Sequence, residues 1–425
     1  MHDQIDDYIS FAAEVRSEGI RYVVLLGMGG SSLAPQVFQD VFGAESGFPT
    51  LTMLDSTHPS AIRDVEDTIN IQRTLFVVSS KSGTTIETLS LFNFFWNRVS
   101  QVSTRPGHQF VTITDPGTPL ETLARNRGFR HIFHAPPDVG GRYSALTAFG
   151  LVPASLIGMN VHGFLDRAWI MTENCAFCVS SHIALGIVLG AVLGEITMQG
   201  RDKITFLTSS SIKSFPIWLE QLLAESTGKQ GKGIIPIVNE PIPEDLTRYA
   251  ADRCFIALML QTDDNEILEE QLKSITRQGN PTVQIMLPEK INLSQEIYSW
   301  EIAVAAAGAV LGIHPFNQPD VQMAKDLAKK MMAHAEQGIF PEKNLETYSV
   351  LDAASLEQGI RKWLQSARSG DYVAIQAYIA PAREVTEAIQ EIRSEFLNRL
   401  RLATTFGYGP RFLHSTGQLH KGGPG

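Results

Sequence analysis

The chain has 425 residues, enough for two or three domains with substantial hydrophobic cores. Hydrophobic residues make up 44% and charged residues 19%, a balance typical of globular proteins that excludes a disordered or fibrous chain. The excess of 45 acidic over 35 basic residues gives a net charge of −10, so we expect neither nucleic acid nor a membrane surface as a partner. Three cysteines cannot form a disulfide framework, and the first ten residues do not resemble a signal peptide. We therefore expect a cytoplasmic protein.

Short apolar runs alternate with longer amphipathic segments along the chain. This alternation predicts an α/β fold, in which parallel sheets are covered by helices. Strands are expected at residues 21–26, 50–54, 74–79, 109–114, 203–208, 233–238, 254–260 and 282–287. A helix is expected at 301–311. In the tail, the run at 371–379 and the charged segment at 383–400 predict a small β–α–β unit.

Residues 175–194 contain no Asp, Glu, Lys or Arg and are long enough to span a bilayer. Gly186, Gly190 and Gly194 recur at every fourth position, which favours close packing against another helix. Because basic residues do not flank the stretch, we interpret it as a helix buried in the core.

The first predicted strand is followed by a glycine- and serine-rich turn at residues 27–32. Glycines there allow the backbone to approach a ligand, and the helix that follows offers free N–H groups to an anion. The dinucleotide-binding fingerprint requires glycine where this chain has Ser32. Asp55, however, lies about 20 residues further on, where a ribose-binding acid is found. On this pattern alone, a nucleotide site remains a competing interpretation.

The loop at residues 79–85 gathers five hydroxyl groups and one ammonium group between an apolar strand and a helix. Several short donors, a lysine and a positive helix end suit a phosphate monoester, although the spacing is not that of a nucleotide P-loop. A capping box from Thr84 to Glu87 would explain two of these residues without any ligand. Because it leaves the other hydroxyls unexplained, we predict phosphate binding.

Three charged residues further along give weaker signals when taken alone. Arg142 follows two glycines and could reach into a cleft, although a surface arginine is the commoner case after a turn. Glu225, near the end of an amphipathic helix, and Lys325, in a helix that starts near Pro319, would each be ordinary solvated residues.

Metal and redox sites are poorly supported. His131 and His134 are spaced so that they would face opposite sides of a strand. Cys175 and Cys178 begin an apolar helix and do not follow a first strand, and with Cys254 they are too few for a four-thiolate zinc site. We expect no metal and no cofactor.

Five motifs, in this order, resemble the phosphoglucose isomerase (glucose-6-phosphate isomerase) family. They are GMGGSSLAP, SSKSGTTIET, GGRYSALTAFGL, LLAESTGKQGKG and HPFNQPDVQMAK, within residues 19–330. The last motif has Asn317 and Gln322 where the family usually has Asp and Glu. The tail ATTFGYGPRFLHSTGQLHKGGP is similar to the isomerase part of bifunctional transaldolase/phosphoglucose isomerase proteins.

The resemblance implies two sugar-isomerase (SIS) domains, each a parallel sheet flanked by helices. We place them at residues 1–160 and 161–335, followed by a C-terminal α/β extension at 336–425. The active site would lie between the two domains and at the interface of a homodimer. A fused or partner transaldolase domain is a further partner that the resemblance implies.

The resemblance also implies a role for each residue that matches a family motif. Substrate binding would fall to Gly30, Ser31, Ser80, Lys81, Ser82, Thr85, Glu87 and Gln318, with the sugar phosphate held by the hydroxyls after the third strand. Glu225 would be the base that moves a proton between C2 and C1, and Arg142 would stabilise the enediolate. A carboxylate with a tuned pKa and a fixed cation suit this chemistry, which requires no metal or redox cofactor.

The group that opens the sugar ring stays undecided. The family uses a histidine between the base and the last motif, but none occurs here between Glu225 and His314. His420 is our first candidate, because it follows a Gly- and Gln-containing turn as the family's histidine does. It would act across to a partner subunit. His414, His314 and Lys325 are the alternatives.

The resemblance implies reversible isomerisation of glucose 6-phosphate and fructose 6-phosphate through an enediol(ate). One alternative is another SIS-type isomerase, acting on mannose 6-phosphate or an amino sugar phosphate. A second is a module that senses sugar phosphates without turnover, which would need the phosphate loop but neither Arg142 nor Glu225.

Overall fold

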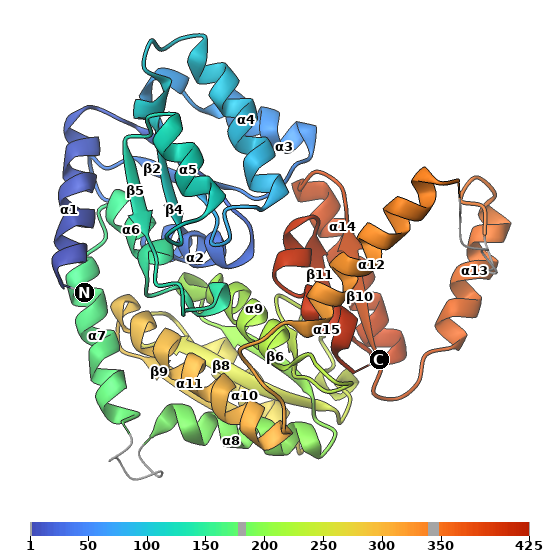
Figure 1. Ribbon diagram of the computed structural model, residues 1–425. Helices are drawn as coiled ribbons and strands as arrows, with labels where there is room; N and C mark the ends of the chain where they lie inside the picture. Colours follow the sequence, from blue (N-terminus) through green and yellow to red (C-terminus); the bar gives the residue numbers. More distant parts are fainter. Residues whose placement is uncertain (1, 177–183, 339–347, 425) are drawn as a thin grey trace.

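The computed structural model describes residues 2–176, 184–338 and 348–424 of the chain. Within them, the chain forms two parallel sheets with helices on both faces and a smaller α/β extension (Figure 1). This architecture confirms the α/β fold class predicted from the alternation of apolar and amphipathic segments.

The first sheet consists of five parallel strands in the order β2-β1-β3-β4-β5. Its strands are β1 (Tyr22–Leu26), β2 (Thr50–Leu54), β3 (Thr74–Ser79), β4 (Phe110–Thr114) and β5 (His131–His134). Strand β1 pairs with β2 on one side and with β3 on the other, so the strand order reverses at β1. In open α/β sheets, ligands bind at such a reversal, beyond the carboxyl ends of the strands.

Helices cover both faces of the first sheet, because successive side chains of its strands are apolar and point to opposite sides. Val24 and Val78 pack toward α3 and α4, whereas Val23 and Val77 belong to the cluster formed with α1, α2 and α6. These helices, with α5, are α1 (His2–Ser17), α2 (Leu33–Phe42), α3 (Pro59–Thr68), α4 (Ile86–Ser100), α5 (Pro119–Asn126) and α6 (Ala148–Leu156).

The second sheet consists of four parallel strands in the order β7-β6-β8-β9. Its strands are β6 (Lys203–Thr208), β7 (Ile235–Ile237), β8 (Arg253–Leu260) and β9 (Thr282–Leu287). The accompanying helices are α7 (Val161–Asn174), α8 (Leu185–Met198), α9 (Phe215–Thr227), α10 (Glu266–Arg277) and α11 (Leu293–Leu311). One hydrophobic cluster continues from Phe38 of α2 to Trp218 and Leu222 of α9, so the two halves share a core.

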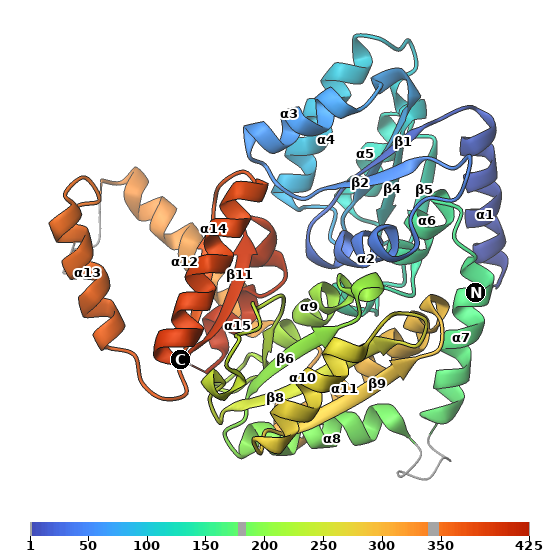
Figure 2. The same cartoon turned by 180° about the vertical axis from the view of Figure 1, so that it is seen from behind.

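The C-terminal extension packs beside the second sheet (Figure 2). Its elements are α12 (Pro319–Glu336), α13 (Ala353–Gln365), β10 (Tyr372–Ala377), α14 (Arg383–Glu395), β11 (Ala403–Tyr408) and α15 (Gly417–Gly422). Strands β10 and β11 pair in parallel across α14, which confirms the predicted β–α–β unit. Ala403 and Leu419 are buried against Ile235, Ile237 and Ala224, so the extension contacts the helix that carries Glu225.

Helix α8 contains most of the charge-free stretch, of which residues 177–183 lie outside the described part of the chain. Its glycines pack against α11, and a Cβ at Gly190 would lie 2.1 Å from the carbonyl oxygen of Ala303. The predicted close packing is therefore confirmed, but burial of the whole helix is wrong. Leu185, Val188 and Val192 are exposed, because only one face of α8 meets α11. None of the described helices has the length and hydropathy that a bilayer crossing requires.

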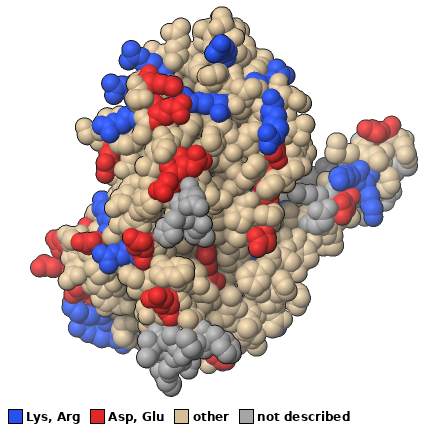
Figure 3. All heavy atoms as spheres, turned by 60° about the vertical axis from the view of Figure 1, so that its left-hand side comes forward, with Lys and Arg blue, Asp and Glu red and all other residues tan. Residues whose placement is uncertain are grey.

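Acidic and basic side chains are interspersed over the face of the molecule seen in Figure 3. The overall charge of −10 is thus not concentrated in one acidic region of that face.

Candidate active site

The predicted site residues come from loops beyond the carboxyl ends of the first sheet's strands and from helix α9. Gly30 and Ser31 lie in the turn after β1, and Ser80–Thr85 form the loop after β3. Arg142 lies in the turn after β5. A Cβ on Gly30 would be 2.2 Å from the carbonyl oxygen of Gly141, so glycine allows the first turn to pack against the turn that carries Arg142.

The C-terminal segment covers the first turn. Gly29 has a φ of +54°, and a Cβ there would lie 2.2 Å from the carbonyl oxygen of His414. That oxygen also accepts a hydrogen bond from Nε2 of Gln221 at 2.8 Å. Glycine at position 29 therefore provides both the backbone conformation and the space that bring His414 to the site.

The hydroxyl-rich loop ends at the N-terminus of α4, which begins at Ile86 and has Thr85 as its N-cap. The Thr85 side chain makes no capping hydrogen bond. Its Oγ1 lies 3.0 Å from Oγ of Ser80, and Oγ of Ser82 lies 3.0 Å from Oγ1 of Thr84. The capping box from Thr84 to Glu87 is therefore wrong, because the helix begins later than it requires. The hydroxyls gather instead beside backbone N–H groups that no cap side chain satisfies, an arrangement suited to an anion.

Lys81 is held at the edge of this loop by an ion pair. Its Nζ lies 2.8 and 2.7 Å from the two carboxylate oxygens of Asp115 and donates to the carbonyl oxygen of Pro136 at 3.1 Å. The lysine thus fastens the loop to the end of β4.

Arg142 and Glu225 lie side by side in the interior, with 3% and 5% of their surfaces exposed. Nε of Arg142 donates to Oγ of Ser226 at 2.7 Å, and Nη2 donates to the carbonyl oxygen of Pro315. Nη1 lies 3.9 Å from Oε2 of Glu225. The guanidinium group is therefore fixed in place next to the carboxylate.

Burial raises the pKa of Glu225 to about 7, although Arg142 and a hydrogen bond from Gln221 oppose the shift. Nε2 of Gln221 donates to Oε2 of Glu225 at 3.1 Å. A carboxyl group with a pKa near neutrality can both accept and release a proton under ordinary conditions.

Gln221, Ser226 and Lys229 also line this cluster, and the sequence analysis missed all three. Burial and the nearby Arg142 lower the pKa of Lys229 to about 8, and its Nζ donates to the carbonyl oxygen of His314 at 2.6 Å. Gln221 could have been found, because it lies four residues before Glu225 and hence on the same helix face. Ser226 and Lys229 could have been found as well, because both lie in the motif LLAESTGKQGKG that contains Glu225.

The structure brings His414, and not His420, to this cluster. Nε2 of His414 lies 3.0 Å from Oε1 of Glu87, at the start of α4. The two ring nitrogens of His420 instead lie 3.4 Å from the hydroxyl of Tyr372 and 3.1 Å from Oγ1 of Thr416.

The remaining candidates lie near the start of α12. His314 is exposed, and its Nδ1 accepts from the backbone N–H of Phe316. Gln318 directly precedes α12. Lys325 lies within α12, but its side chain falls outside the described part of the structure.

The nucleotide interpretation loses support, because Asp55 contacts the C-terminal segment. Its Oδ2 lies 3.3 Å from Nη1 of Arg411. In the described residues, no group of three or more His, Cys, Asp or Glu side chains is arranged to hold a metal ion.

Comparisons with known proteins point to the same family as the five sequence motifs. The family model for phosphoglucose isomerase matches residues 10–235. A probable glucose-6-phosphate isomerase of Methanococcus maripaludis is 26% identical over 78% of this chain and 83% of its own length. The glucose-6-phosphate isomerase of Campylobacter jejuni is 27% identical over 77% of this chain and 89% of its own.

Solved structures show the same fold at low sequence identity. A glucose-6-phosphate isomerase from Chlamydia trachomatis has a TM-score of 0.65 at 18% identity and covers 86% of this chain and 76% of its own. A putative phosphosugar isomerase from Bacillus subtilis has a TM-score of 0.51 at 14% identity, over 75% and 97% of the two chains.

Proposed function

Because this chain belongs to the phosphoglucose isomerase family, we propose that it interconverts glucose 6-phosphate and fructose 6-phosphate by aldose–ketose isomerisation. The observation that carries the proposal is the buried Glu225 carboxylate beside a fixed arginine, next to a loop rich in hydroxyls. A coupled assay that follows either sugar phosphate tests it, and a purified chain without turnover on both would refute it.

In the proposed mechanism, Glu225 takes a proton from C2 of the open-chain aldose and returns it to C1, while the hydroxyl proton moves from the oxygen of C2 to the oxygen of C1. Between the removal and the return of the carbon-bound proton, negative charge lies on the oxygens of the enediolate. Arg142 stabilises this charge without giving up a proton of its own, since a guanidinium stays protonated at any ordinary pH. Gln221 holds the carboxylate through its hydrogen bond and so orients the base.

Ser80, Ser82 and Thr85 bind the phosphate group, together with the backbone N–H groups at the start of α4. The support for this role is that Ser80 pairs with Thr85, that Ser82 pairs with Thr84, and that the N-cap residue Thr85 makes no capping hydrogen bond to the helix. Gly30 and Ser31 line the site from the first turn, and Glu87 contacts the substrate from the start of α4.

Thr85→Ala is expected to weaken binding of fructose 6-phosphate roughly ten- to a hundredfold, because a hydrogen bond to a charged group contributes about 1.5–3 kcal/mol. Binding of unphosphorylated fructose should change little. Titration calorimetry measures both ligands, and Thr122→Ala on α5 provides a control outside the loop. Equal losses for the two ligands would show that Thr85 does not bind the phosphate.

We assign ring opening to His414 in preference to His420. The support is its position between Glu87 and Gln221, which lie on the two sides of the site. An imidazole can deliver a proton to the ring oxygen and take one from the C1 hydroxyl, because its ring nitrogens can each bind or release a proton. Lys325 is the alternative, because it lies in the last family motif, at a position that the resemblance associates with ring opening.

His414→Ala is expected to slow turnover of glucose 6-phosphate about a hundredfold or more, the usual range for loss of a general acid–base group. An aldose phosphate without ring-closing hydroxyls should react at nearly the normal rate, and His420→Ala should have a smaller effect. If His414→Ala slows both substrates equally while Lys325→Ala slows only the cyclic one, ring opening belongs to Lys325.

A homodimer is proposed from the outer face of α7 and α8. Trp169, Leu185, Val188, Val192 and Met198 are exposed on these two helices, and a subunit interface would bury them. Light scattering should give twice the chain mass of 46.8 kDa, and a single chain mass in solution would contradict the proposal.

Three further assignments remain proposals. The domain limits 1–160, 161–335 and 336–425 are supported by the sheets, because each of them lies within one range. A transaldolase, fused or separate, acts with this chain, as the motif in its tail suggests. A cytoplasmic location is supported by the low cysteine content.

A further inference from the structure

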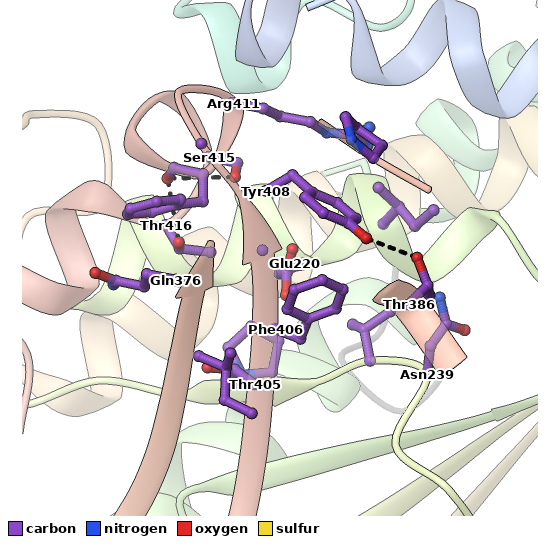
Figure 4. A pocket seen from close by; sticks show the side chains of 18 of the residues that line it. Glu220, Asn239, Gln376, Thr386, Thr405, Phe406, Tyr408, Arg411, Ser415 and Thr416 are labelled. Carbon is purple, nitrogen blue, oxygen red and sulfur yellow. Dashed lines mark hydrogen bonds between the residues drawn. The ribbon is translucent and has the colours of Figure 1, made fainter. Parts of the chain in front are cut away.

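A second cavity, of about 310 Å³, lies against a different face of α9 from the one that carries Glu225 (Figure 4). Its walls come from all three parts of the chain: α9 and the end of β7, the ends of β10 and β11, the segment after β11, and the turn after β2. Ile217 and Glu220 of α9 line it, whereas Gln221 and Glu225 face the proposed active site. Its volume is at the lower end of the range for small-molecule sites.

The two arginines that border the cavity are already engaged. Arg393 donates through Nε, Nη1 and Nη2 to Thr404, Gln390 and the carbonyl oxygens of Val238 and Asn239, which uses its full set of five N–H groups. Arg411 donates to Oε1 of Gln36 and lies 3.3 Å from Oδ2 of Asp55. Neither positive charge is therefore fully available to an anionic ligand.

Glu220 differs from these groups. In the described part of the chain, its carboxylate has neither a hydrogen-bond donor nor an ion-pair partner, and Figure 4 shows it pointing into the cavity beside Phe406. Burial raises its pKa to about 7, and Arg411 and Arg393 lower it only in part. Glu220 is only partly buried, so its carboxylate is accessible to a ligand that enters the cavity.

Aromatic rings and neutral polar groups complete the lining. The rings of Phe406 and Tyr408 meet edge to face with their centroids 4.8 Å apart, and the Tyr408 hydroxyl bonds to Thr386 at 2.7 Å. Gln376 and Asn239 border the same space. Aromatic faces attract cations, particularly where water is excluded.

We propose that this cavity binds a small organic amine, whose ammonium group pairs with Glu220 and whose apolar part packs on Phe406 and Tyr408. Among the charged side chains that line the cavity, the Glu220 carboxylate has no partner in the described part of the chain. The ligand that complements it is therefore a cation.

An occupant of this cavity would also influence the proposed active site, a step that rests on the proposed function. Arg411, Phe412, Ser415 and Thr416 line the cavity, and His414 lies between them in the chain. A ligand that holds this segment in one position fixes His414 beside Glu87. Such a ligand alters turnover if it binds this position of the segment more tightly than other positions.

Benzylamine is a suitable probe, because it combines an ammonium group with a ring, and benzyl alcohol is its neutral counterpart. In calorimetry, we expect benzylamine to bind the wild-type chain at least about tenfold more tightly than benzyl alcohol. Glu220→Gln should reduce this ratio to about one, whereas Glu269→Gln on α10 should leave it unchanged. Phe406→Leu should weaken benzylamine binding and provides a second variant should Glu220→Gln fail to fold.

Equal affinities for the two probes in the wild type would overturn the proposal, and so would a preference that survives in Glu220→Gln. Tighter binding of benzoate, lost in Arg411→Gln, would also overturn it by showing an anion site. Binding is measured without substrate, so a failure here is distinct from a failure of isomerase activity.

Saturating benzylamine should change turnover of glucose 6-phosphate in the wild type but not in Glu220→Gln. Unchanged turnover at saturation would refute the link to His414.

Discussion

Replacing Glu225 with glutamine is expected to lower kcat for glucose 6-phosphate about 10²–10⁴-fold while KM changes little. The amide has the shape of the carboxylate and can still lie beside Arg142, but it cannot accept the proton from C2. Steady-state assays in both directions measure the loss, with circular dichroism to verify the fold.

Glu296→Gln provides a matched control on α11. Burial raises the pKa of Glu296 to about 7 as well, but this carboxyl has no place in the proposed reaction. The control variant should retain near-normal turnover. Near-normal turnover in Glu225→Gln would mean that another group is the base.

The raised pKa of Glu225 also predicts how activity depends on pH. The base works only when it is ionised, so kcat/KM should fall as the pH drops below about 7, the value to which burial raises the pKa. This acid limb should disappear from the residual activity of Glu225→Gln, whereas titration of the substrate phosphate affects both proteins alike.

Replacing Arg142 with lysine is expected to lower kcat about 10²–10³-fold, the range seen when one oxyanion-stabilising donor is removed. Lysine keeps the charge, but it cannot bond to Ser226 and to the carbonyl oxygen of Pro315 while still pointing at the substrate. A hydroxamate analogue of the enediolate should lose affinity by a similar factor, because Arg142 acts on the charge of the transition state.

Arg130→Lys is a suitable comparison, because Arg130 forms its ion pairs with Glu14 of α1 and with Glu18, the residue after that helix. It should leave both turnover and analogue binding unchanged. If Arg142→Lys weakens substrate and analogue binding equally while kcat is retained, then Arg142 holds the substrate and has no special role in the transition state.

Buried strands were the part of the fold best predicted from the sequence. Strands β2, β3, β6 and β9 have the predicted bounds. Strands β3 and β6 are buried along nearly their whole length, as a continuous apolar run predicts, whereas the edge strands β2 and β9 are only partly buried and were indicated by their apolar and β-branched residues. The start of α4 was predicted less well. The hydroxyl of Thr84 bonds to Ser82, so the helix begins later than the capping box implied. The exposed face of α8 could not be foreseen either, because hydropathy does not show which side of a helix meets a neighbour.

The proposed site was only partly predictable, because contacts between segments that are distant in the sequence bring its residues together. The motifs identified the loop at residues 80–85, Arg142 and Glu225 without showing that the last two lie 3.9 Å apart. The choice between His414 and His420 depends on how the tail folds over Gly29, where a side chain would collide with the carbonyl oxygen of His414. Such a long-range contact leaves no local pattern in the sequence.

The central claim is that Glu225 carries a proton between C2 and C1 of the sugar phosphate. Proton NMR of glucose 6-phosphate and fructose 6-phosphate in D₂O tests it most directly. With the wild-type enzyme, deuterium should enter C2 of the aldose and C1 of the ketose during turnover. With Glu225→Gln, incorporation at both carbons should slow by the same factor as kcat. Incorporation at the wild-type rate in Glu225→Gln would contradict the assignment of Glu225 as the base.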